Sequence, residues 1–149
     1  MTLSERYRTL EVRLELLETH YVEELYEKSH LGELEDRDYD LCRGYRVLCH
    51  AEIESYLEDR AEELLLFSIH QWRNEKKITK SLLSLCSYFK FIENHSKDLE
   101  TKIIKICNDF KKEVIKQNHG LKEANLKKLF KPLGIDFSSN DLDQTWINT

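Results

Sequence analysis

Four polar side chains of this sequence recur at intervals that place them on one face of a predicted helix. Arg43, Arg46, His50 and Glu54 are separated by three, four and four residues, and side chains at such intervals project from the same side of a helix. An imidazole can transfer a proton, and a guanidinium can hold the negative charge that develops on a phosphodiester. Glu54 lies one turn from His50 and can orient it.

This pattern predicts Arg43, His50 and Glu54 as catalytic residues and Arg46 as a phosphate-binding residue. A second interpretation stays open, because the same residues occur on the ordinary solvated face of a charged helix. On spacing alone, that structural interpretation is the more common one for such a pattern.

A lysine-rich segment forms a second candidate site. Residues 76–131 hold 14 lysines and 6 acidic residues, a net charge of +8. Lys122, Lys127, Lys128 and Lys131 gather around one short predicted helix. Such a patch binds RNA phosphates without choosing a sequence, so Lys122, Lys127 and Lys128 are predicted to bind RNA. Lysine-rich helix exteriors are also common on proteins that bind no nucleic acid.

Other kinds of site find no support in the sequence. It contains no Gly-rich phosphate loop, serine elbow, Asp-x-Asp cluster or His-Glu-x-x-His pair. Its cysteines form no C-x-x-C pair and lie among apolar residues of predicted helices, so we expect reduced and buried thiols; they are Cys42, Cys49, Cys86 and Cys107. Neither a metal site nor a cofactor is predicted.

Composition favours an all-α fold. Of the 149 residues, 40% are hydrophobic and 34% charged, with only 4 Gly and 1 Pro, too few for the tight turns of a β-sandwich or barrel. No apolar run could span a membrane and the first residues are charged, so we expect a cytoplasmic protein. Residues 1–75 carry a net charge of −10 and residues 76–149 of +5, which suits self-association or a polyanion partner.

The elements that must position these side chains are five helices, predicted over residues 4–29, 38–73, 79 or 81 to 92, 96–117 and 122–130. Leu3, Tyr7, Leu10, Leu14, Leu17, Tyr21 and Leu25 form a heptad stripe in the first helix, and packing inside a bundle is its default use. Gly44 interrupts the second helix, either by chance or because another backbone approaches there. Ser96 is the predicted cap of the fourth helix.

Two segments resemble a known family. Arg43–Glu58 (RGYRVLCHAEIESYLE) resembles a helix of HEPN-domain proteins, and Asn118–Ile135 (NHGLKEANLKKLFKPLGI) resembles the later segment of the RiboL-PSP-type HEPN branch. The resemblance covers roughly residues 38–60 and 115–149. It implies an antiparallel bundle of about five helices that forms a homodimer. Many members are metal-independent endoribonucleases of toxin–antitoxin or phage-defence systems, in which the RNA 2′-hydroxyl attacks the adjacent phosphate.

The sequence departs from this family in one respect. The branch carries its signature, an arginine and a histidine with four to six residues between them, on the last helix, but no Arg or His follows Lys131 here. Residues 1–149 are therefore expected to form a single HEPN-like domain without its final helix. Either the natural chain continues beyond Thr149 or the member is inactive. A further alternative is that Trp146 anchors a terminal turn to the core.

Arg43 and His50 fit the signature spacing but correspond to an earlier helix of the family. Two functions are therefore carried forward. One is an RNA-targeting endoribonuclease with an antitoxin or defence-system partner. The other is a non-catalytic, antitoxin-like interaction module that docks through the stripe between Leu3 and Leu25.

Overall fold

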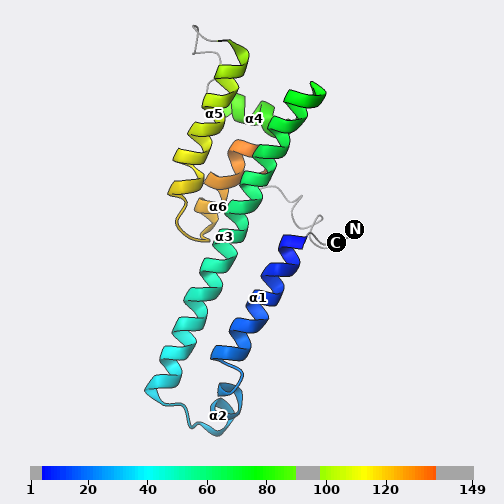
Figure 1. The fold of residues 1–149 in the computed structure, drawn as a ribbon. Coiled ribbons are helices and arrows are strands. Elements are labelled where there is room, and N and C mark those ends of the chain that lie inside the picture. Colours follow the sequence, from blue (N-terminus) through cyan, green and yellow to red (C-terminus); the bar gives the residue numbers. More distant parts are fainter. Residues whose placement is uncertain (1–4, 90–97, 137–149) are drawn as a thin grey trace. The chain divides into compact units, whose positions relative to one another are not determined.

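The structure is a computed structural model that describes residues 5–89 and 98–136 (Figure 1). Within these ranges it contains helices and turns and no strand, which confirms the all-α prediction. The α-helices are α1 (Glu5–Tyr21), α2 (Leu25–Leu31), α3 (Asp36–Glu75), α4 (Lys80–Tyr88), α5 (Leu99–Glu113) and α6 (Glu123–Phe130). Two 3₁₀ turns follow α5 and α6: η2 (Ile115–Gln117) and η3 (Lys131–Leu133).

The chain divides into two compact units, Met1–Tyr56 and Leu57–Thr149, and α3 contributes residues to both. Each unit is described by itself. The predicted helix over residues 38–73 corresponds to α3, and the one over 122–130 to α6. The terminal turn predicted around Trp146 lies outside the described residues.

In the first unit, α1 packs along the first half of α3 (Figure 1). Leu17 is buried in this contact, and the rings of Tyr7 and Tyr56 meet edge to face with centroids 6.2 Å apart. Arg13 Nε lies 2.9 Å from Glu52 Oε1. Every stripe residue within the described range is buried or half-buried: Tyr7, Leu10, Leu14, Leu17, Tyr21 and Leu25. The stripe therefore packs inside this unit, as its default use predicted.

The helix predicted over residues 4–29 is broken by a turn at residues 22–24, and that prediction is wrong. The amide of Glu23 bonds to the carbonyl of Glu18 at 3.1 Å, five residues back instead of four. Val22 and Leu25 are both buried on either side of the turn. The hydrogen bond across five residues ends α1, and the chain turns before α2 begins at Leu25.

α2 ends at Gly32, which has φ +73°. The amide of Glu33 bonds to the carbonyl of Lys28 at 2.9 Å, the six-to-one bond of a Schellman motif. Glycine adopts this left-handed conformation without steric cost. The turn brings α2 next to the start of α3.

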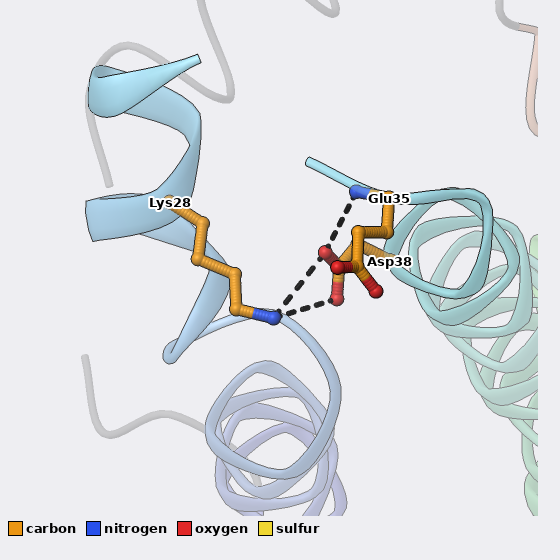
Figure 2. A network of polar contacts seen from close by, with 3 residues as sticks. All are labelled: Lys28, Glu35 and Asp38. Carbon is orange, nitrogen blue, oxygen red and sulfur yellow. Dashed lines mark hydrogen bonds and ion pairs between the residues drawn. The ribbon is translucent and has the colours of Figure 1, made fainter. Parts of the chain in front are cut away.

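Asp38 organises the start of α3 (Figure 2). Its Oδ2 accepts a hydrogen bond of 3.0 Å from the amide of Glu35, and Lys28 Nζ lies 3.2 Å from Oδ1. Only 5% of the Asp38 side chain is exposed. The amide of Glu35 and then the ammonium of Lys28 lower the pKa of Asp38 below its usual value. The carboxylate thus completes the reciprocal half of a capping box and ties α2 to α3.

The close approach predicted at Gly44 is made by a side chain and not by another backbone. A Cβ on Gly44 would lie 3.5 Å from Cε1 of Tyr21, an ordinary contact distance. The packing of α1 therefore does not require a glycine at position 44, and an alanine would fit there.

In the second unit, the second half of α3 packs with α4, α5 and α6 around one apolar core. Its most deeply buried side chains include Leu65, Leu85, Phe110, Leu129 and Leu133. Ion pairs link α3 to α5 at both ends of their contact: Glu62 with Lys111, and Arg73 with Glu100.

Side chains cap two helices of this unit. Thr79 Oγ1 accepts a 3.1 Å hydrogen bond from the amide of Leu82, which confirms one of the two predicted starts of α4. α5 is capped by Asp98, whose Oδ1 accepts from the amide of Thr101 at 2.9 Å. Ser96, the predicted cap, lies outside the described ranges.

Two glycines give opposite expectations for replacement by alanine. Gly44→Ala should raise the free energy of unfolding by about 0.5–1 kcal/mol, because alanine favours a helix and its Cβ fits beside Tyr21. Gly134→Ala should lower it by about 1 kcal/mol or more, because Gly134 has φ +78° and a Cβ there would lie 3.1 Å from Cβ of Ser84. Urea unfolding followed by circular dichroism measures both changes. Equal effects of the two substitutions would contradict this account.

Asp38 should make stability depend on acid pH. Because its pKa is lowered in the folded state, the stability that the carboxylate contributes is present above about pH 4 and is lost as the pH falls through the folded pKa. Asp38→Asn should therefore be less stable than the parent at pH 7, and the difference should shrink below about pH 4. Asp36→Asn, at an exposed position of the same turn, is the matched control. A difference that stays constant down to pH 2 would contradict the assignment.

Candidate functional site

The candidate site occupies the exposed face of the first half of α3. His50 Nδ1 lies 3.7 Å from Glu54 Oε2, and the side chains are 49% and 22% exposed. The helix thus brings together the histidine and the glutamate that the sequence spacing paired. This distance is longer than a hydrogen bond, so the two groups form an ion pair only when the imidazole is protonated.

The two arginines lie on the same face, but neither contacts His50. Arg43 Nη1 binds Oδ1 of Asp40 at 2.7 Å, an ion pair exposed on both sides. Arg46 is exposed one turn before His50. His50 comes seven positions after Arg43, which is a rise of about 10.5 Å along the helix. The two side chains can therefore approach one phosphodiester only if both extend toward it.

Two adjacent rows of side chains make up this face of α3. One row holds Tyr39, Arg43 and Val47, and the other holds Arg46, His50 and Glu54. Tyr39 is 51% exposed and Val47 67%. Sequence reasoning missed Tyr39 and Val47, although their four-residue spacing from Arg43 was the signal that could have found them.

The predicted RNA-binding lysines lie on and before α6. Lys127 Nζ lies 2.6 Å from Glu123 Oε1, one turn earlier. This contact raises the pKa of Lys127 and lowers that of Glu123. Lys122 and Lys128 are exposed, whereas Lys127 is half-buried. Lys122 and Lys128 are thus more accessible to a phosphate than Lys127.

The predicted phosphate-binding set falls into two parts. Arg46 belongs to the unit Met1–Tyr56, and the three lysines belong to the unit Leu57–Thr149.

The cysteines differ in exposure. Burial raises the pKa of Cys107 to about 11 and also raises that of Cys86, so both thiols stay protonated at neutral pH and are poor nucleophiles. Cys49 is half-buried, and its contact with Tyr45 raises the pKa of the tyrosine. Cys42 is exposed, Cys86 is half-buried like Cys49, and Cys107 alone of the four is buried, so the prediction of four buried thiols is wrong.

The described residues, 5–89 and 98–136, were searched for metal-binding groups and for membrane-spanning helices. None of these residues forms a group of three or more His, Cys, Asp or Glu side chains that could hold a metal ion. Among the described helices, none has the length and apolar content needed to cross a membrane.

Comparison with known proteins supplies the family. No curated protein and no solved structure is significantly similar to the chain. The family model described as RiboL-PSP-HEPN matches residues 8–149, which include both the α3 face and the segment around α6. This match confirms the resemblance of Arg43–Glu58 and Asn118–Ile135 to HEPN proteins, and the chain belongs to the RiboL-PSP-HEPN family.

Proposed function

We propose that this protein targets RNA and cleaves it as a metal-independent endoribonuclease of a toxin–antitoxin or phage-defence system. Membership of the HEPN family relates the chain to RNA. The observation that carries the proposal is the pairing of exposed His50 with half-buried Glu54 beside Arg43 and Arg46 on one face of α3.

His50 is the proposed general base. Because Glu54 lies on the Nδ1 side of the ring, Nε2 is left to take the proton from a ribose 2′-hydroxyl. The 2′ oxygen then attacks the adjacent phosphorus, and the bond from phosphorus to the 5′ oxygen breaks. The products are a 2′,3′-cyclic phosphate and a 5′-hydroxyl. Glu54 stabilises the imidazolium that forms during proton transfer.

Arg43 and Arg46 are the proposed phosphate ligands. A guanidinium can donate two parallel hydrogen bonds to phosphate oxygens and stabilise the charge of the pentavalent transition state. Arg43 must release Asp40 to do this. Because that ion pair is exposed on both sides, it contributes little to stability and a phosphate can replace it.

A homodimer would supply the general acid that one copy lacks. The departing 5′ oxygen needs a proton, and a second His50 from a partner copy could provide it as general acid. A further antitoxin or defence-system protein would then regulate the assembled site. The heptad stripe is a poor docking surface for that protein, because its described residues already pack inside the first unit.

Lys122, Lys127 and Lys128 are proposed to hold RNA phosphates outside the reacting centre. Their contribution is electrostatic and independent of sequence. Lys127 should contribute least, because Glu123 already neutralises it.

Cleavage should depend on His50 and not on divalent metal. We expect the protein to cleave single-stranded RNA in excess EDTA and to leave a 2′,3′-cyclic phosphate end. His50→Ala should lower the cleavage rate by about 100- to 10,000-fold, the range for loss of a general base. Gel electrophoresis of an end-labelled RNA measures the rate, and phosphatase resistance identifies the cyclic end.

His30→Ala is the matched control, since His30 is an exposed histidine on α2. Its rate should equal that of the parent protein. RNA binding by His50→Ala, measured by fluorescence anisotropy, should stay within about threefold of the parent. Parent protein that binds RNA and never cleaves it would favour the non-catalytic module, and EDTA-sensitive cleavage would overturn the metal-independent mechanism.

The lysines should set the salt dependence of RNA binding. Lys122→Ala or Lys128→Ala should each reduce the slope of log K against log salt by about 0.7, the value for one phosphate contact on a single strand. Lys127→Ala should reduce it less because of Glu123. Lys112→Ala, an exposed lysine on α5, should leave the slope unchanged. Anisotropy titrations over several salt concentrations measure the slopes, and identical slopes for all four variants would remove these lysines from the interface.

A further inference from the structure

We propose that Tyr39 stacks on a base of the RNA strand bound along the exposed face of α3. This inference rests on the proposed function and goes beyond it by assigning a base-contacting side chain. Neither the charge pattern nor the histidine spacing identifies such a residue.

The position of Tyr39 follows from the geometry of the helix. It precedes Arg43 by four residues and His50 by eleven, which places it about 6 Å and about 16.5 Å from them along the helix axis. Tyr39, Arg43 and Val47 form one row, and Arg46, His50 and Glu54 form the next. A strand that follows the face thus has charged groups on one row and an aromatic and an aliphatic side chain on the other.

The ring of Tyr39 is available for stacking. Other tyrosines of this unit have partners: the ring of Tyr7 packs on that of Tyr56, and the hydroxyl of Tyr26 donates to Glu18. Tyr39 is 51% exposed, and among the described residues its side chain makes no hydrogen bond, ion pair or ring contact.

Tyr39 lies one turn before Arg43, which suits a nucleic acid. The exposed residues Asp36 and Asp40 flank it in the sequence, and Asp40 must release Arg43 when a phosphate binds. Exposed aromatic side chains beside arginines are the usual platform for unpaired bases. A stable protein interface needs about 800 Å² from each partner and a core depleted of charge. This face offers two exposed large apolar side chains, Tyr39 and Val47, with the charged Arg43 between them.

The test compares RNA with and without bases. The probes are a fluorescent 2′-O-methyl oligoadenylate of eight residues, which cannot be cleaved, and an abasic oligomer with the same number of phosphates. The parent should bind oligoadenylate more tightly than the abasic oligomer. Tyr39→Ala should weaken binding of oligoadenylate by roughly 5- to 100-fold, the range for loss of one stacked base. It should leave the dissociation constant of the abasic oligomer unchanged.

Conservative and matched variants separate stacking from other roles. Tyr39→Phe keeps the ring and should bind oligoadenylate within about threefold of the parent. Tyr88→Ala removes a similarly exposed tyrosine from α4 and should bind both oligomers like the parent. The melting temperature of Tyr39→Ala should match that of the parent, because an exposed ring supports little of the core.

Three results would overturn the assignment. Equal weakening of both oligomers by Tyr39→Ala would mean that the ring does not contact a base. Unchanged binding of oligoadenylate would remove Tyr39 from the interface while leaving the proposed RNA binding intact. A change in molecular mass by light scattering, with RNA binding unaltered, would assign Tyr39 to a protein interface. If the parent binds neither oligomer, the proposed function fails together with the inference.

Discussion

The carboxylate of Asp38 is a charge held almost entirely out of solvent at the point where the longest helix begins. It is stabilised by the amide of Glu35 and the ammonium of Lys28 (Figure 2). A buried carboxylate without such partners would cost several kcal/mol. The contact therefore couples the end of α2 to the first turn of α3, and the rotational position of α3 at its start determines which of its side chains face solvent.

The candidate site of the first unit depends on how α3 is rotated about its own axis. The side of α3 that meets Tyr21 carries Gly44, and the opposite side carries Arg43, His50 and Tyr39. One helix thus serves as a packing surface on one side and as a polar platform on the other. In the second unit the same helix is a core element, with Ala61 and Leu65 buried.

Periodicity was enough to predict the long helices, because their apolar spacing and caps are local signals. α3 differs from its predicted bounds by two residues at each end, and Thr79 caps α4 as its hydroxyl suggested. The turn at residues 22–24 was not predictable in this way, since the apolar spacing continues through it to Leu25 and no Gly or Pro marks it. Likewise, Arg43 had both Asp40 and His50 at helical spacing, and only the folded chain shows that it binds Asp40.

The sequence by itself determined the helical class, the family resemblance and the placement of His50 one turn from Glu54, because each follows from the residues within a few turns of helix. Only the tertiary structure decided that the heptad stripe packs inside the first unit, that Cys42 is exposed and that Asp38 is buried. The physical reason is that burial depends on which face meets another helix. That choice is made by contacts between residues far apart in the chain, such as Tyr7 with Tyr56 and Arg13 with Glu52.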